Sequence, residues 1–184
     1  MARKLLGIAA VVCAAAPAQA TTLVGLDLPE LSRLSDVVVH GKVASVQAHW
    51  TGDHQRIVTE VQVEVTEAFK GQAGKTVLID QPGGVVGDIG QLVQGVAAFT
   101  AGEEVVVFLG RRPGERFMLT GMGQGKFRVA RSTDGKAAFA VPEDLGGALV
   151  VDPATHRPLP DRPAALTLQS LRAQVRASAA TSKP

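Results

Sequence analysis

Hydrophobic and polar residues alternate most regularly between residues 57 and 69. Apolar side chains recur at every second position, for example at Val61, Val63 and Val65, and polar ones such as Glu64 lie between them. Successive side chains of a β-strand point to opposite faces of the sheet. The pattern therefore predicts one long strand with a buried face and a solvent-facing one.

The stretch before it, from 36 to 50, predicts a second long strand that changes faces. Its apolar residues occupy odd positions in the first half and even positions in the second. Such a switch implies a β-bulge near Ala44 and Ser45, with Gly41 easing the bend. Bent strands of this kind let a small sheet curl into a barrel.

Shorter apolar runs and turn residues predict the remaining elements. Further strands are expected at 76–80, 103–109, 117–120, 126–130 and 137–141. A short helix is expected at 29–35, with Asp27 as a possible cap and Pro29 in its first turn. Residues 21–24 are expected to add an edge strand.

These elements predict a mainly β fold, a small OB-like β-barrel with a short N-terminal helix and a C-terminal helix. The expected parts are a barrel domain at 21–141, a proline-rich extended segment at 142–163, a C-terminal helix at 164–178 and a disordered tail at 179–184.

Residues 1–20 have the pattern of a secretory signal peptide. Arg3 and Lys4 precede an apolar run at 5–16, and the small residues at 18–20 form a cleavage site. Cleavage there makes Thr21 the mature N-terminus and places the protein in the periplasm or outside the cell. The alternative is a lipoprotein attached through Cys13.

Removal of this leader changes the charge and the cysteine count. The leader carries two of the 19 basic residues and none of the 17 acidic ones, so the mature chain has no formal net charge. This balance gives no support to nucleic-acid binding through a basic surface. The only cysteine, Cys13, is lost as well, which excludes disulfides and thiol chemistry in the mature chain.

Residues 81–95 are rich in glycine and predict a long loop. Long loops in compact domains are frequently functional. We therefore expect this loop and the mature N-terminus to contact a partner. The candidate contact residues are Thr21, Thr22, Gly83, Gly84, Gly87 and Asp88.

The sequence contains no recognisable catalytic or metal-binding motif, and we expect neither a cofactor nor a bound metal. The four histidines have no ligands at zinc-site spacing and are expected to be solvent-exposed side chains of loops. Two alternatives to a binding protein stay open. One is a secreted hydrolase using strand-end carboxylates such as Asp80 and Asp88, and the other is a structural component of the cell envelope.

Three segments resemble the netrin-like module, an OB-type barrel. They are SDVVVHGKV at 35–43, VQVEVTEAFKG at 61–71 and FTAGEEVVVFL at 99–109. A similar pattern occurs in uncharacterised secreted bacterial proteins, and the resemblance covers roughly residues 35–130. The best-known members of the family are the tissue inhibitors of metalloproteinases.

The resemblance implies a protein-binding, protease-inhibitor-like role. In those inhibitors the mature chain begins with a disulfide-bonded cysteine whose amino and carbonyl groups bind the protease zinc. Thr21 has that position here, and the mature chain has no cysteine to brace it. We expect an exported, non-enzymatic, monomeric binding module that is not inserted in the membrane and does not bind nucleic acid. Its partner is expected to be a protein, and a secreted protease is one candidate.

Overall fold

The computed structural model describes residues 21–159 and 164–181. The expected leader and the last three residues of the expected tail lie outside the described residues. The helices are α1 (Leu28–Leu34), α2 (Leu168–Thr181) and two short 3₁₀ turns, η1 (Pro113–Glu115) and η2 (Met122–Gly125). The strands are β1 (Thr22–Val24), β2 (Val37–Trp50), β3 (Ile57–Lys70), β4 (Thr76–Pro82), β5 (Gly84–Val86), β6 (Ile89–Gln91), β7 (Glu104–Arg112), β8 (Arg116–Leu119), β9 (Lys126–Arg131), β10 (Ala138–Pro142), β11 (Leu149–Val151) and β12 (Leu166–Thr167).

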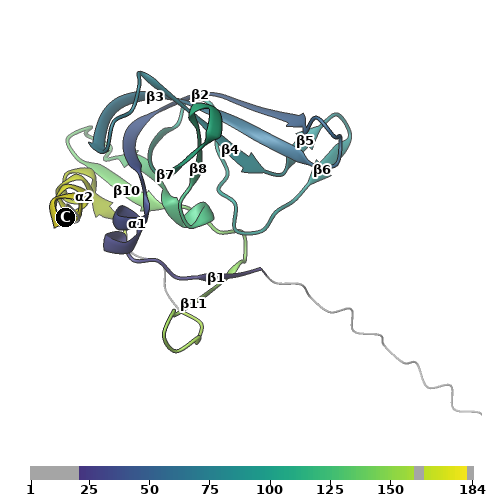
Figure 1. The fold of residues 1–184 in the computed structure, drawn as a ribbon. Coiled ribbons are helices and arrows are strands. Elements are labelled where there is room, and N and C mark those ends of the chain that lie inside the picture. The colour runs from purple at the N-terminus through teal and green to yellow at the C-terminus, as the bar shows by residue number, and fades with distance from the viewer. Residues whose placement is uncertain (1–20, 160–163, 182–184) are drawn as a thin grey trace, which may run out of the picture.

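Five of the strands pair in a closed ring, in the order β2, β3, β4, β8, β7 and back to β2. The β4–β8 pairing is parallel and the other four are antiparallel. Strands β9, β10 and β12 continue the sheet outward from β7, and α1 and α2 lie on that side (Figure 1). The expected mainly β, barrel-like fold with two helices is therefore confirmed.

The long strands β2 and β3 curve around the barrel because their pairing is interrupted. Their register shifts at three places, one of them between Val43 and Ser45, which confirms the predicted bulge. At Gly41 the two backbones approach so closely that a Cβ atom would collide with the carbonyl oxygen of Glu64. Glycine is required there by this close approach.

The curved sheet separates two hydrophobic cores. One fills the barrel and includes Val61 and Val63, which are fully buried as the alternation predicts. The other lies between the outer face of the sheet and the two helices, where Leu171 and Val175 of α2 are also fully buried. The C-terminal helix thus docks on the barrel. It continues to Thr181, so the prediction of disorder from residue 179 is wrong for 179–181.

The N-terminal part of the chain is attached to the barrel by α1 and β1. Asp27 caps α1 as expected, since its Oδ1 accepts a hydrogen bond from the Glu30 N–H at 2.8 Å. Strand β1 pairs in parallel with β11, which lies inside the expected extended segment 142–163. Among the described residues, neither α1 nor α2 is long and apolar enough to cross a lipid bilayer.

Candidate functional site

The glycine-rich segment is a β-hairpin, so the prediction of a long loop at 81–95 is wrong. Strands β5 and β6 pair with Val86 opposite Ile89, which leaves Gly87 and Asp88 as a two-residue turn. Gly87 has a φ of 59°. A positive φ at the first turn position is what tight hairpin turns need and what glycine adopts without strain. The two flanking apolar runs were too short to be recognised as strands.

Three hydrogen bonds fix the base of the hairpin to the start of β3. The Gly83 N–H donates to the Ile57 carbonyl at 2.8 Å, and the Ile57 N–H donates to Gln91 Oε1 at 2.7 Å. The Thr59 hydroxyl donates to the Gly83 carbonyl at 2.7 Å. A Cβ atom on Gly84 would collide with the Thr59 hydroxyl. Gly83 and Gly84 therefore position the hairpin, while Gly87 and Asp88 are exposed at its tip.

The hairpin segment carries the most exposed large hydrophobic side chains of the described residues. Their exposed fractions are 68% for Val85, 55% for Ile89 and 89% for Leu92. We call these three residues the hairpin surface. They are not among the predicted contact residues, although Gly-Asp between two apolar runs is a known hairpin signal.

The expected N-terminal contact residues lie beside the chain that leaves this hairpin. The Thr21 N–H donates to Gln94 Oε1 at 3.1 Å, and the Thr21 carbonyl accepts from the Leu149 N–H at 2.9 Å. Thr22 is exposed on β1. Both backbone groups of Thr21 are thus engaged within the chain, so binding a metal through them requires breaking two hydrogen bonds.

The strand-end carboxylates of the hydrolase hypothesis are not arranged as a pair. Asp80 on β4 is held by Arg116, whose Nε donates to Asp80 Oδ2 at 2.8 Å, and Arg116 also pairs with Glu60 at 2.6 Å. The hydrogen bonds to Asp80 and then Glu60 raise the pKa of Arg116 despite its partial burial. Asp88 lies on a separate element, the exposed turn of the hairpin. Asp80 is therefore part of a structural ion pair.

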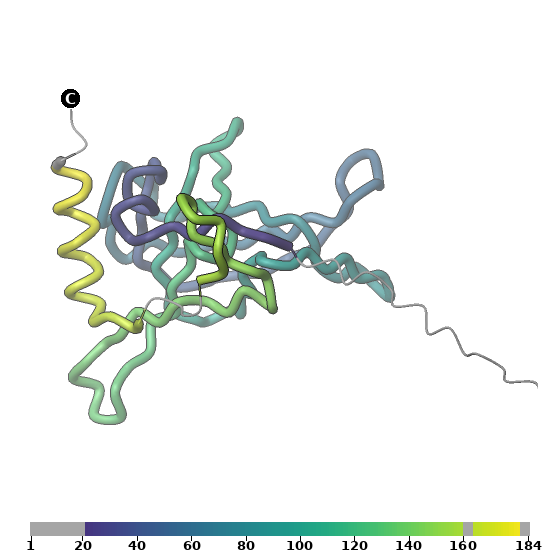
Figure 2. The backbone as a smooth tube through the Cα atoms, turned by 90° about the horizontal axis from the view of Figure 1, so that it is seen from below, coloured from purple at the N-terminus to yellow at the C-terminus, as the bar shows by residue number. Residues whose placement is uncertain are grey.

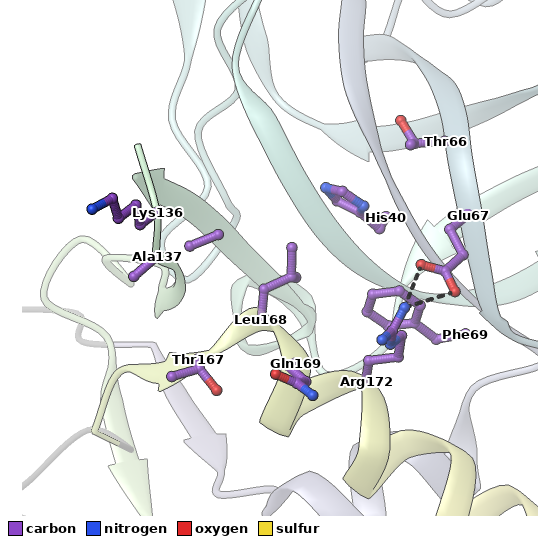
Figure 3. A pocket seen from close by; sticks show the side chains of 11 residues that line it. His40, Thr66, Glu67, Phe69, Lys136, Ala137, Thr167, Leu168, Gln169 and Arg172 are labelled. Carbon is purple, nitrogen blue, oxygen red and sulfur yellow. Dashed lines mark hydrogen bonds and ion pairs between the residues drawn. The ribbon is translucent and has the colours of Figure 1, made fainter. Parts of the chain in front are cut away.

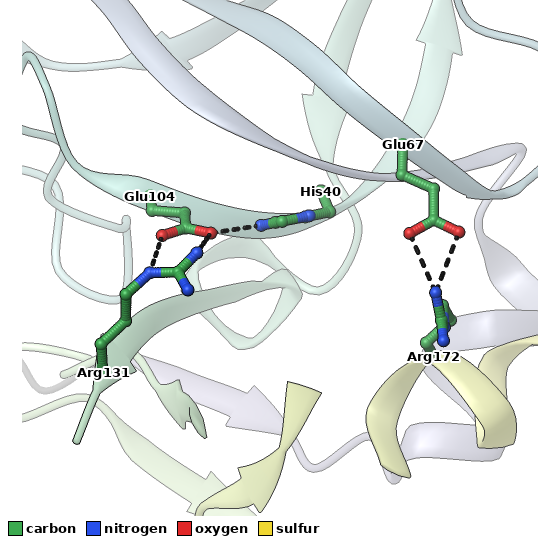
Figure 4. Close-up of polar contacts among 5 residues, drawn as sticks. All are labelled: His40, Glu67, Glu104, Arg131 and Arg172. Atoms are coloured by element: carbon green, nitrogen blue, oxygen red, sulfur yellow. Dashed lines mark hydrogen bonds and ion pairs between the residues drawn. The ribbon is translucent and has the colours of Figure 1, made fainter. Parts of the chain in front are cut away.

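His40 contradicts the expectation that all four histidines are exposed in loops. It lies on β2, is only 8% exposed and borders a cleft beneath α2 (Figure 3). His40 Nε2 is 2.7 Å from Glu104 Oε1, and Arg131 donates to both oxygens of Glu104, at 2.7 and 3.0 Å (Figure 4). Partial burial opposes the charge on Glu104, but the hydrogen bonds from Arg131 and His40 outweigh it and lower the pKa of this carboxyl.

Lys126 is a second polar group that no pattern in the sequence predicts inside the protein. It is 2% exposed, and its ammonium pairs with Glu103 at 2.8 Å and Glu143 at 3.0 Å. It also donates to the Ala98 carbonyl and lies 4.4 Å from the centre of the Phe99 ring. All three ammonium donors have acceptors, which is typical of a structural site.

The described residues contain no group of three or more His, Cys, Asp or Glu side chains placed to hold a metal ion. The chain matches no protein-family model, and no curated protein sequence is significantly similar to it.

Proposed function

We propose that the mature chain is an exported, non-enzymatic binding module that recognises another protein through the hairpin surface and the neighbouring N-terminal strand. The observation that carries the proposal is the exposure of Val85, Ile89 and Leu92 within eight residues of sequence, with Val85 and Ile89 on opposite faces of one hairpin. Exposed apolar side chains gathered in one place mark interaction sites more often than scattered ones do.

The energy available at this surface is sufficient for recognition. Complete burial of one aliphatic side chain of this size is worth about 1.5–3 kcal/mol. Among the described residues, β6 pairs only with β5, so its outer edge is open. We propose that the partner adds an extended segment to this edge and covers the apolar side chains, a mode in which main-chain hydrogen bonds supply affinity and side-chain pockets supply specificity.

The resemblance to the netrin-like module supports the same class of partner. The closed ring of five strands with one parallel pairing is compatible with an OB-type barrel. A secreted protease is the candidate partner that the resemblance suggests. We propose that the hairpin leads the contact, because the backbone N–H and carbonyl of Thr21 are already hydrogen-bonded to Gln94 and Leu149.

The test is a quantitative pull-down with tagged protein comprising residues 21–184, applied to the secreted and envelope fractions of the producing cell. We expect the unmodified protein to recover one protein in stoichiometric amount. The double variant Val85→Ser/Leu92→Ser should recover at least tenfold less. Phe139→Ser is the matched control, because Phe139 is a 37% exposed apolar side chain on β10, away from the hairpin.

Thermal unfolding should show that both variants fold. Equal recovery by the unmodified protein and the double variant would contradict a role for the hairpin surface. Loss of recovery by Phe139→Ser alone would move the contact to the opposite side of the molecule.

A further inference from the structure

A second surface lies at the opposite side of the molecule from the hairpin, where α2 packs on the sheet (Figure 2). Here a cleft of about 650 Å³ opens between strands β2 and β3 on one side and β10, β12 and the start of α2 on the other (Figure 3). Ligand pockets in proteins typically have volumes of about 300–1,000 Å³. Phe69 and Leu168 give the cleft apolar walls, and His40 and Arg172 are among its polar groups.

His40 presents one nitrogen that the protein does not use. In the neutral tautomer whose Nε2–H donates to Glu104, Nδ1 carries no proton. Within the described residues Nδ1 has no hydrogen-bond partner, and none of their buried side-chain nitrogens or oxygens lacks one. Nδ1 is therefore accessible to solvent, although the whole residue is more than nine-tenths buried. In this state it can accept a hydrogen bond from a ligand.

Arg172 supplies positive charge that the protein does not fully compensate. Its Nη1 lies 3.3 and 3.4 Å from the two oxygens of Glu67, and Arg176 makes the shorter contact with that carboxylate, at 2.8 Å. Two guanidinium groups thus share one carboxylate, which leaves an excess positive charge. Arg172 lines the cleft and has further N–H donors available for a second anion.

The start of α2 adds to the positive potential. Leu168 and Gln169, its first residues, line the cleft, and Thr167 accepts a hydrogen bond from the Ser170 N–H at 3.1 Å. The N-terminal end of a helix carries a partial positive charge. Arg172 and the helix end therefore favour a negatively charged ligand group in the same space that His40 borders.

We propose that this cleft binds a small organic carboxylate that has an apolar body and a hydroxyl group. Arg172 and the start of α2 receive the carboxylate, His40 Nδ1 accepts the hydrogen bond of the hydroxyl, and Phe69 and Leu168 contact the apolar part. Glu104 and Arg131 act as positioning residues, because they hold the His40 ring with Nδ1 free. The site is separate from the hairpin surface and does not depend on the protein partner proposed there.

Mandelate is a suitable probe, since it combines a carboxylate, a neighbouring hydroxyl and a phenyl ring. We would titrate ¹⁵N-labelled protein (residues 21–184) with mandelate and follow the amides of Leu168 and Gln169 and the imidazole of His40. We expect saturable shifts with a Kd on the order of 1 mM, which is reasonable for a ligand of this size. Mandelamide, which lacks the charge, should bind at least tenfold more weakly.

Variants separate the proposed roles. Arg172→Gln should weaken mandelate binding at least fivefold, while Arg56→Gln, at the exposed turn between β2 and β3, should leave it unchanged. Phenylacetate, which lacks the hydroxyl, should bind at least threefold more weakly than mandelate. Glu104→Gln should remove most of that difference, and the long-range ¹H–¹⁵N spectrum of His40 should report the change in protonation.

Several outcomes would overturn the proposal. They are the absence of saturable shifts in the cleft at 20 mM probe, equal affinity for mandelamide, and unchanged affinity in a folded Arg172→Gln variant. Equal affinity for phenylacetate and mandelate would overturn the assignment of His40. Because the side chain of Arg172 is 40% exposed, its replacement should leave the fold intact, and amide shifts outside the cleft should confirm this.

Discussion

Lys126 and His40 are both almost completely buried, and both are held by glutamate side chains, but their surroundings differ. Every donor of the Lys126 ammonium has an acceptor inside the protein. His40 uses Nε2 internally and lines a cleft, and its Nδ1 has no hydrogen-bond partner among the described residues. The comparison shows that burial alone does not identify a functional group. A buried polar side chain becomes a candidate for binding when part of its hydrogen-bonding capacity stays unused.

The largest expected loss of stability comes from burying a charge that has no partner. Val63→Asp places a carboxylate in the barrel core, where Val63 is fully buried, and should lower the free energy of unfolding by more than about 4 kcal/mol. Glu64→Lys, on the exposed face of the same strand, should change it by less than about 0.5 kcal/mol. Urea unfolding measures both. Similar losses for the two variants would contradict the assignment of faces on β3.

Removal of the Lys126 side chain should lower the free energy of unfolding slightly less than Val63→Asp does. Lys126→Ala leaves Glu103 and Glu143, each at most 15% exposed at the side chain, without their shared cation. Breaking a buried ion pair from one side typically costs about 3–5 kcal/mol, so we expect about 3 kcal/mol in urea unfolding. Adding Glu103→Gln and Glu143→Gln should recover part of the loss. A triple variant less stable than Lys126→Ala would contradict an electrostatic origin.

The His40 cluster should contribute less, and its contribution should depend on pH. Glu104→Gln should cost about 1 kcal/mol at pH 7, because charged acceptors form stronger hydrogen bonds than neutral ones. The pKa of Glu104 is lowered by folding, so its stabilisation is complete above the ordinary value of 4.5 and is lost as the pH falls below it. The difference in the free energy of unfolding between the unmodified protein and Glu104→Gln should therefore shrink as the pH falls below 4.5. A difference that is constant over this range would show that the charge of Glu104 does not stabilise the fold.

The smallest effect is expected at Arg176. The Arg176 side chain is 53% exposed, and Arg172 still pairs with Glu67 when the Arg176 side chain is removed. Arg176→Ala should therefore change the free energy of unfolding by less than about 0.5 kcal/mol. A loss above 1 kcal/mol would contradict the view that Glu67 has more positive charge around it than it needs.

Local patterns in the sequence were sufficient to predict most of the strands. The alternation around Val63 depends only on neighbouring residues, and so do the bulge before Ser45 and the Asp27 cap. The hairpin was missed because β5 and β6 have three residues each, too few to show a period of two. The glycines of this segment are as compatible with a long loop as with a tight turn.

The His40 cluster could not be predicted, because it depends on the register of two strands far apart in the sequence. Lys42 on β2 pairs with Glu104 on β7, which places Glu104 diagonally across from His40. A shift of one residue would have moved Glu104 to the other face of the sheet. Register is set by the packing of the whole barrel, and no local pattern around His40 reports it.

The pairing of β1 with β11 determines when the folded chain is complete. The ring of strands and its inner core are formed by residues that precede β11. Strand β1, in contrast, can pair only with β11, which is more than 120 residues away in the sequence. The first strand to emerge is thus one of the last to be placed. Because Thr21 is held by Leu149 of that late partner, the N-terminal part of the proposed binding surface exists only in chains in which β11 has already been placed.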